Sequence, residues 1–155
     1  MIVKPVGMLD ILDSPELPRL IAEYTDECAN PELLENARPD RERYVQLEAA
    51  GVLHALGMYE DEGEAKLVGF GIVIISPVLH FSKTIAVVES VFLRKDHRKG
   101  WVGRALMGAL HGVAKACGVD GVYFSAPKGS AFEKLCRAMK LKETNATFFW
   151  GISRA

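Results

Sequence analysis

The sequence predicts an α+β fold with three layers, in which a mixed, mostly antiparallel central sheet is flanked by helices. Strand-like and helix-like stretches alternate along the chain, and two long apolar stretches are joined by a short turn, as in a β-hairpin. A β-branched stretch then runs into a glycine-containing junction and an amphipathic helix, which is typical of a βαβ-like unit. The 155 residues suffice for one buried core, so we expect a single domain over residues 1–155.

The N-terminal third is predicted from capping residues and prolines. "IVKPV" at residues 2–6 is expected to form a short first strand. Three helices should follow, each opened by a residue that can cap a helix N-terminus and, in two cases, by a proline in the first turn. These helices are expected from Ser14 to about Cys28, from Asn30 to Pro39 and from Asp40 to Gly51.

The rest of the chain is predicted to form strands separated by two helices. The expected strands are residues 52–60, 66–75, 84–93, 121–126 and 145–153, and the expected helices are residues 101–117 and 129–140. "DEGE" at 61–64 should turn between the first two strands, and Ser76-Pro77 should end the second. Tyr123 and the aromatic run 148–150 are expected to pack in the core or in the strands.

The composition excludes several classes of protein. The chain is 49% hydrophobic and 25% charged, as is usual for a soluble globular protein. The longest apolar stretch, residues 67–75, is too short to span a bilayer, and the N-terminus lacks a signal-peptide pattern. Three cysteines without a CxxC pair and four histidines without ligand spacing argue against a disulfide framework and a metal site. We therefore expect a cytoplasmic protein with no metal ion and no membrane partner.

The charges are distributed unevenly, although the net charge is only −1. Residues 1–64 carry 15 acidic and 5 basic residues, whereas residues 94–142 carry 11 basic and 3 acidic residues. One interpretation is an ordinary solvated surface, and the other is a basic half that holds an anion and an acidic half that faces a cation. Basic and aromatic residues are not interleaved and no helix-turn-helix spacing is present, so we expect no nucleic-acid partner.

The stretch "LRKDHRKGWVGRALM" at residues 93–107 joins an expected strand to an expected helix. A helix N-terminus exposes unpaired N–H groups and a partial positive charge, and both favour a bound anion. Gly100 and Gly103 leave room for a phosphate beside the backbone, and Arg98, Lys99 and Arg104 can pair with it. The alternative is a plain helix start with a solvated basic face. A Walker-type loop is excluded because no Gly-Lys-Ser/Thr follows.

The wider stretch "VVESVFLRKDHRKGWVGRALM" at residues 87–107 resembles the central motif of the GNAT acetyltransferases. In that family a strand is followed by (Gln/Arg)-x-x-Gly-x-(Gly/Ala) and a helix. Here Val91-Phe92-Leu93 matches the strand end, Arg98 matches the Gln/Arg position, and Val102-Gly103 matches the end of the motif. The order of the other expected elements also agrees, and the resemblance is strongest over residues 84–113.

The resemblance implies acetyl-CoA as cosubstrate and an amine as acceptor. Members of the family bind the pyrophosphate through backbone N–H groups of this loop and run the pantetheine arm along the central strand. The amine attacks the thioester directly in a ternary complex. The cofactor-binding residues implied here are Val91, Phe92, Leu93, Arg98, Lys99, Gly100, Trp101, Val102, Gly103 and Arg104.

Glu89 and Cys136 are the catalytic candidates. Glu89 is the only charged residue within an apolar strand, and a period of two places it on the face of Val91 and Leu93. Many relatives carry a carboxylate here that acts as a base on the amine; the alternative is a structural carboxylate. Cys136 stands where the family usually has a tyrosine that often serves as general acid, and its alternative role is a small core residue.

Two further positions depart from the family pattern. Trp101 stands where the motif has its first glycine, so its side chain should point away from the phosphates. Gly129 stands where an asparagine commonly touches the pantetheine arm. These departures leave open a non-catalytic acyl-CoA-binding or interaction domain on the same fold.

The acceptor is the least determined part of the prediction. In this fold the early helices, here residues 14–55, wall the acceptor site, and they lie in the acidic half of the chain. A cationic amine is therefore favoured, and a polyamine, an amino sugar, a lysine side chain and a peptide N-terminus all remain open. The oligomeric state also stays open, with a homodimer as one option.

Overall fold

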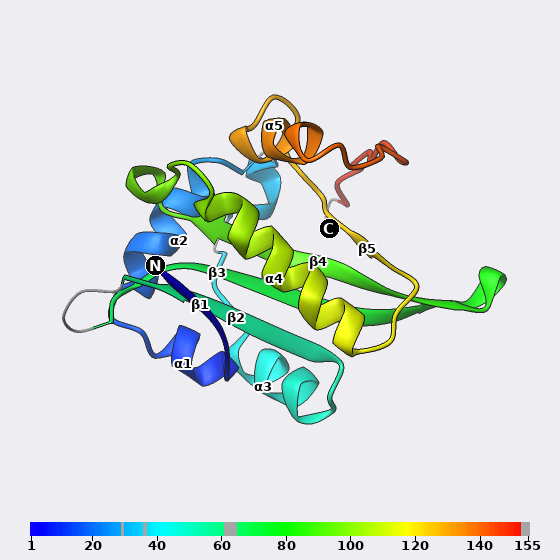
Figure 1. The fold of residues 1–155 in the computed structure, drawn as a ribbon, viewed down its shortest axis with the longest axis horizontal. Coiled ribbons are helices and arrows are strands. Elements are labelled where there is room, and N and C mark those ends of the chain that lie inside the picture. Colours follow the sequence, from blue (N-terminus) through cyan, green and yellow to red (C-terminus); the bar gives the residue numbers. More distant parts are fainter. Residues whose placement is uncertain (29, 36, 61–64, 153–155) are drawn as a thin grey trace.

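The computed structural model describes residues 1–28, 30–35, 37–60 and 65–152, and its centre is a five-stranded sheet in the order β1-β2-β3-β4-β5. The first four strands pair antiparallel with their neighbours, and β5 pairs parallel with β4. The strands are β1 (Ile2–Val6), β2 (Leu53–Tyr59), β3 (Leu67–Val78), β4 (Lys83–Leu93) and β5 (Gly121–Tyr123). This mixed, mostly antiparallel sheet with flanking helices confirms the predicted fold class (Figure 1).

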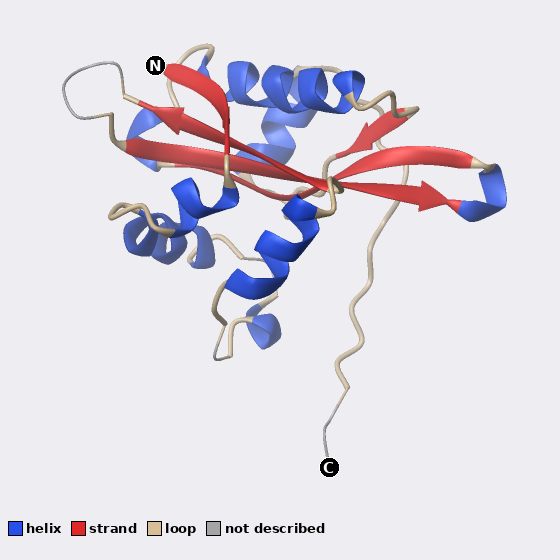
Figure 2. Ribbon diagram, turned by 90° about the horizontal axis from the view of Figure 1, so that it is seen from below, coloured by secondary structure: helices blue, strands red, loops and turns tan. Residues whose placement is uncertain are grey.

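Helices cover both faces of the sheet (Figure 2). They are α1 (Met8–Leu12), α2 (Leu17–Thr25), α3 (Arg41–Ala49), α4 (Val102–Ala116) and α5 (Ala131–Ala138), with short 3-10 turns η1 (Pro31–Leu33), η2 (Leu79–Phe81) and η3 (Lys95–His97). None of the helices in the described part of the chain is long and apolar enough to cross a bilayer.

Two apolar clusters form the core, one on each face. Along β2, Leu56 and Met58 belong to the cluster under α4, whereas Leu53 and Ala55 belong to the cluster under α1, α2 and α3. This alternation follows the period of two that the sequence of β2 shows. Helix α4 contributes a buried stripe at helical spacing, made of Val102, Leu106, Met107, Leu110 and Ala114.

A β-bulge in β4 changes which side chains share a face. Val88 pairs with Val73 and Ser90 pairs with Ile72, so that Glu89 is an extra residue between them. Val88 and Val91 consequently both pack on the α4 side although they are three residues apart. Glu89 instead reaches a side chain of α3 on the opposite side of the sheet. The prediction that Glu89 shares a face with Val91 and Leu93 was therefore wrong, because the bulge reverses the alternation.

The sheet opens between β4 and β5. Only Ile85, Ala86 and Val87 of β4 pair with β5, while β4 continues to Leu93. The chain that leaves β5 runs away toward α5 (Figure 1). In the described chain no strand continues the sheet on this side of β4 beyond Val87. The backbone edge of residues 88–93 is thus available to a ligand, and we call this opening the β4 wedge.

Several predicted boundaries need correction. The expected helix from Ser14 starts later, at Leu17, with Pro18 in its first turn, and Ser14 accepts a hydrogen bond from the Glu16 N–H in a preceding turn. Strand β3 continues through Ser76-Pro77 to Val78. Pro77 lies beyond the last β3 residue that pairs with β2, so its missing N–H costs no hydrogen bond on that side. The predicted turn at 61–64 lies outside the described residues.

The predicted last strand is the largest error. Residues 145–152 have no regular secondary structure, and Phe148, Trp150 and Ile152 are 91%, 90% and 84% exposed. Tyr123 is also exposed, at 44%, so these aromatic side chains do not pack in the core. The pattern gave strong β-propensity, but such propensity forms a strand only where an edge is available to pair with it.

Candidate active site

The junction between β4 and α4 forms the backbone of an anion site. Trp101 precedes the first turn of α4 without a side-chain cap, and the N–H groups of Gly103 and Arg104 lie in that turn, where the helix supplies no carbonyl partner. Gly100 has a φ of 56°, a left-handed conformation that bends the chain into the helix at no steric cost. This arrangement matches the expected phosphate-binding backbone.

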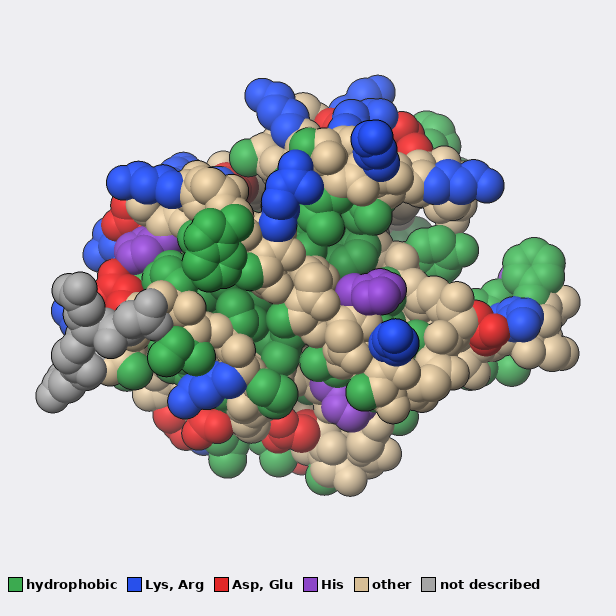
Figure 3. All heavy atoms as spheres, viewed as in Figure 1, with side chains coloured by type: hydrophobic (Ala, Val, Ile, Leu, Met, Phe, Trp, Pro, Cys, Tyr) green, Lys and Arg blue, Asp and Glu red, His purple; other side chains and the backbone are tan. Residues whose placement is uncertain are grey.

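The side chains of this junction divide into two groups. Lys99, Trp101 and Arg104 are exposed, and Arg104 donates a long hydrogen bond to the Ala138 carbonyl at the end of α5. Lys and Arg side chains gather over the start of α4 and over α5 on the face shown in Figure 3. The basic surface therefore lies beside the helix N-terminus that favours an anion.

Arg98 is not part of that exposed group. Its Nε donates to the Leu93 carbonyl at 2.7 Å, and its two terminal nitrogens donate to the two Glu27 carboxylate oxygens at 2.9 and 3.1 Å. The guanidinium also lies 5.1 Å from the centre of the Phe92 ring. The expected pairing of the Arg98 side chain with a phosphate is therefore not what the structure shows, since this arginine fastens the loop to β4 and to the chain just after α2.

A second contact fastens the loop to the end of β2. His97 Nε2 lies 2.6 Å from a Glu60 carboxylate oxygen, and its Nδ1 contacts Asp96. The sequence gave His97 no role, because its partner lies 37 residues away and only the fold brings them together. The phosphate-binding backbone is thus held from two directions, by Arg98 on one side and His97 on the other.

The β4 wedge lies next to this junction. Val91 and Leu93 pack with the α4 cluster, and Val102 is buried in the same cluster. Phe92 points to the opposite face, where its ring meets the Tyr24 ring edge-on at 5.8 Å. Phe92 also pairs with Phe70 of β3, so among the expected cofactor-binding residues of β4 it is Val91 and Leu93 whose backbone groups face the wedge.

Glu89 lies in a small polar cluster on the α3 side of the sheet. The Tyr44 hydroxyl donates to Glu89 Oε1 at 3.0 Å. Burial, and after it the Glu89 charge, raises the pKa of Tyr44 well above its ordinary value. The same two causes, followed by Cys28, raise the pKa of Tyr24. Both phenols consequently keep their protons at neutral pH and serve as hydrogen-bond donors.

Sequence reasoning missed both tyrosines of this cluster. Neither Tyr44 nor Tyr24 belongs to a motif that the sequence singles out. The helical spacing of α3 indicates that Tyr44 points toward the sheet, but it does not show which strand residue Tyr44 meets. That residue is set by the bulge at Glu89, which the sequence does not reveal.

Cys136 lies on α5, which packs at the N-terminal end of α4. The Leu135 side chain lies so close to Gly103 that a Cβ there would come within 3.0 Å of Leu135 Cδ2. Cys136 itself is partly buried, and burial raises the pKa of its thiol. Ser130 caps the helix, and Gly129, before it, has a φ of 79° and donates its N–H to the Glu133 carboxylate. Cys136 is therefore a protonated thiol on the helix whose neighbouring residue, Leu135, packs at the start of α4.

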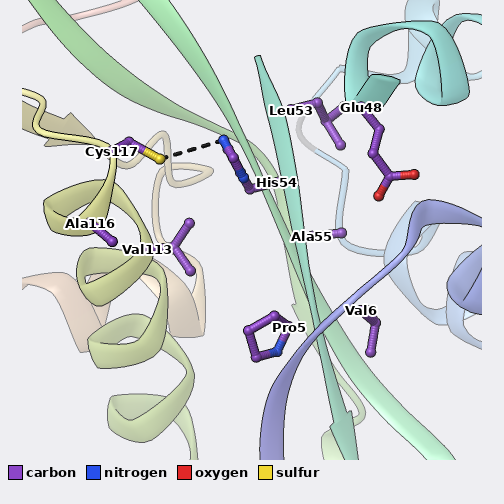
Figure 4. A pocket seen from close by; sticks show the side chains of 9 residues that line it. All are labelled: Pro5, Val6, Glu48, Leu53, His54, Ala55, Val113, Ala116 and Cys117. Carbon is purple, nitrogen blue, oxygen red and sulfur yellow. Dashed lines mark hydrogen bonds between the residues drawn. The ribbon is translucent and has the colours of Figure 1, made fainter. Parts of the chain in front are cut away.

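A separate cavity of about 470 Å³ lies at the other end of α4. Figure 4 shows Cys117 and His54 in its wall, with Cys117 Sγ 3.4 Å from His54 Nε2. Cys117 follows the 15 residues of α4, so it lies about 20 Å from the helix N-terminus. The cavity is thus distinct from the wedge. Among the described residues, no three His, Cys, Asp or Glu side chains gather in a way that could hold a metal ion.

Comparison with solved structures shows a shared fold over nearly the whole chain. A ribosomal-protein-alanine N-acetyltransferase from Brucella melitensis biovar Abortus 2308 is 21% identical, with a TM-score of 0.63 and 100% of both chains covered. The aminoglycoside acetyltransferase meta-AAC0020 from an uncultured soil metagenomic sample, in complex with sisomicin, is 16% identical, with a TM-score of 0.72, 98% of this chain and 96% of that chain covered.

A third solved structure, aminoglycoside N-acetyltransferase AAC(6')-Iy in complex with CoA, is 13% identical, with a TM-score of 0.68, 99% of this chain and 100% of that chain covered. No curated protein matches the sequence. The model of the acetyltransferase (GNAT) family matches residues 15–134, which include β2 to β5, α4 and the junction between β4 and α4. A match over that much of the chain shows that this protein belongs to the acetyltransferase (GNAT) family.

Proposed function

We propose that this protein is an acetyl-CoA-dependent N-acetyltransferase that moves an acetyl group to a primary amine by direct attack in a ternary complex. The observation that carries the proposal is the position of β4 between two different sites. One is the exposed N-terminus of α4 beside the β4 wedge, and the other is the Glu89 cluster on the α3 side.

The residues present fit acetyl-CoA. The N–H groups of Gly103 and Arg104 would hold its phosphates, with the charges of Lys99 and Arg104 nearby. The backbone edge of β4 at Val91 and at the Leu93 N–H would hold the pantetheine arm, whereas the Leu93 carbonyl is already bound by Arg98. When bound, the cosubstrate supplies an acetyl group as a thioester, from which a thiol must leave.

Side chains of this protein would carry out two proton transfers. A primary amine is protonated at neutral pH, so Glu89 would accept a proton from it before or during the attack. Cys136, whose pKa is raised by burial, keeps its proton at neutral pH and would give it to the departing sulfur. The thiols of Cys136 and CoA are close in acidity, so this second transfer is only weakly driven.

A cationic acceptor is favoured by the charge around the α3 side. Residues 1–64 carry the acidic excess of the chain, and Glu89 is exposed there. By their names, one solved relative acts on an alanine of a ribosomal protein and two act on aminoglycosides. Both kinds of acceptor present amines, and the proposal extends that chemistry, but neither molecule, to this protein. The three free cysteines keep the cytoplasm as the proposed compartment.

Turnover against a mixed panel of amines tests the proposal. The purified protein is incubated with acetyl-CoA and a polyamine, an aminoglycoside, a lysine peptide or a peptide with an N-terminal alanine, and thiol release and acceptor mass are followed. CoA alone should raise the melting temperature, because a ligand at about a hundredfold its Kd stabilises the native state by about 2.7 kcal/mol. A CoA-dependent shift without acetylation of any amine would indicate the non-catalytic acyl-CoA-binding alternative. No shift at millimolar CoA would overturn the proposal.

A further inference from the structure

The hydrogen bond between Tyr44 and Glu89 joins residues 45 positions apart. Tyr44 lies in the middle of α3, and its ring packs against the core cluster under α1, α2 and α3. Glu89 stands at the bulge of β4, where its backbone is released from pairing with β3. A partly buried ring on a helix therefore meets an exposed carboxylate whose backbone position is set by the bulge.

The bond uses one carboxylate oxygen. Tyr44 donates to Oε1 at 3.0 Å, Glu89 itself is exposed, and none of the described residues donates a hydrogen bond to Oε2. A hydrogen bond to the charged form of a carboxyl favours that form. It also fixes the rotamer of a side chain that would otherwise be free to turn in water.

The titratable groups around Glu89 come from two helices, α3 and α2, and from residues beside them. Tyr44 reaches it from α3 and interacts with Asp40 at the start of that helix. Tyr24 reaches it from α2, together with Cys28, which follows that helix. Both tyrosines remain neutral at physiological pH, so a hydroxyl and not a phenolate faces the carboxylate.

We propose that Tyr44 is a positioning residue for Glu89, whose hydroxyl holds the carboxylate in one orientation, so that its second oxygen accepts the proton of the acceptor amine. The inference rests on the proposed function, in which Glu89 is the base. An ammonium group that approaches this side of the sheet would meet the exposed Glu89 carboxylate, which attracts a cation.

The first test measures the Glu89 carboxyl directly and needs no turnover. Protein with ¹³C-labelled glutamate is measured by NMR at neutral pH, and the Glu89 carboxyl signal is assigned by its loss in Glu89→Gln. Removal of the hydroxyl in Tyr44→Phe should move that signal, because the carboxylate loses the hydrogen bond that fixes its orientation. Tyr24→Phe removes a hydroxyl from the same cluster and should leave the signal in place.

The second test uses kinetics with any amine that the panel identifies. Tyr44→Phe should lower kcat several-fold on the plateau of the pH profile and leave KM for acetyl-CoA unchanged, because the base is still present but is no longer held in one orientation. A melting curve like that of the wild type would show that the ring still packs.

The two proposals fail in different ways. An unchanged Glu89 carboxyl signal in folded Tyr44→Phe overturns the role of Tyr44 whether or not the enzyme turns over. A changed signal in a protein that acetylates no amine would show that the contact exists but has no catalytic role, and it would count against the proposed function and this inference together.

Discussion

The two sides of β4 are built from different kinds of groups. On the α4 side, the anion site consists of backbone N–H groups at a helix start and a free strand edge, supplied by one continuous stretch from β4 into α4. On the α3 side, the Glu89 cluster consists of side chains from α2, α3 and β4, which are far apart in the sequence. A backbone site can thus be encoded locally, whereas a side-chain site depends on how distant elements pack.

Because of this difference, the two sites should tolerate amino-acid substitutions to different degrees. The anion site accepts Trp101 where the family motif has a glycine, because the binding groups are N–H groups and the Trp101 side chain is 61% exposed. The Glu89 cluster has no such freedom, since each contact is made by one side-chain atom. We therefore expect substitutions on the α3 side to affect the chemical step and substitutions on the α4 side to affect cofactor affinity.

The largest expected effect belongs to Glu89. Glu89→Gln keeps the shape of the side chain and removes the base, so kcat should fall by about a hundredfold or more. The CoA-dependent rise in melting temperature should stay as in the wild type, because the wedge uses other groups. Glu42→Gln, which changes an exposed carboxylate at the start of α3, is the matched control and should keep wild-type rates. Equal rates for Glu89→Gln and wild type from pH 6 to 9 would make Glu89 structural.

Gly103 should give the next largest effect, and on affinity instead of rate. A valine there places branched carbons beside the phosphate-binding N–H groups, so CoA binding should weaken by about tenfold or more, or about 1.4 kcal/mol. The substitution also presses on Leu135, whose Cδ2 would lie 3.0 Å from the new Cβ. Calorimetric CoA titration with a parallel melting curve separates lost binding from lost stability.

Gly108→Val is the control for that experiment. Gly108 is an exposed glycine of the same helix, and an added Cβ meets no atom within 4 Å. It carries the same cost of placing valine in a helix but lies more than a turn away from the anion site. If both valine variants lose CoA affinity equally, the anion site does not lie at the start of α4.

The same difference explains which parts of the fold were predictable. The order of strands and helices from α3 to α5 and the junction at residues 93–107 follow from local patterns, and the structure confirms that order, whereas α1 was not predicted and the expected helix from Asn30 is only the 3-10 turn η1. The bulge at Glu89 and the pairs Tyr44–Glu89 and Arg98–Glu27 follow from tertiary packing, which no local pattern reports. The single domain over residues 1–155 stays a prediction.

The C-terminal segment shows that a strong local pattern does not always form the element that it predicts. Residues 145–152 carry one of the strongest β-propensities in the chain, yet they form no strand in the described structure. A strand needs a neighbouring edge with matching hydrogen-bond groups, and that neighbour is a property of the whole sheet. Propensity therefore predicted the extended character of this segment but not its pairing.

Substitutions of Arg98 and Arg104 should affect different properties. The first should lower the stability of the free protein, and the second should lower its affinity for CoA. Arg98→Ala breaks the bidentate pair with Glu27, whose side chains are 26% and 31% exposed, and should lower the free energy of unfolding by about 1 kcal/mol. Glu27→Gln should reproduce that loss, and the double variant should lose less than the sum. Arg104→Ala should leave the melting temperature of the free protein unchanged while weakening CoA a few-fold. A loss of CoA affinity in Arg98→Ala, together with a loss of stability in Arg104→Ala, would instead place Arg98 at the phosphates.

The smallest effect is expected at Cys136, the only side chain on the α4 side to which the proposal gives a chemical step. Its thiol is protonated at neutral pH, and burial raises its pKa, so it can donate a proton to the departing sulfur only as a weaker acid than an ordinary cysteine. A thiolate also leaves without help, however, and the acidities of the two thiols are similar. Loss of the donor should thus slow turnover far less than the hundredfold that is typical for a required general acid.

Two variants measured at saturating acetyl-CoA test this role. Cys136→Ala should reduce kcat by about two- to fivefold, and Cys136→Tyr should recover it, since a phenol at this position is again a proton donor. Cys117→Ala, at the opposite end of α4, is the matched control and should turn over like wild type. If Cys136→Ala also turns over like wild type, Cys136 is a packing residue. The α4 side of the molecule would then act on the cofactor through backbone and charge alone, and all proton transfer by side chains would lie on the α3 side.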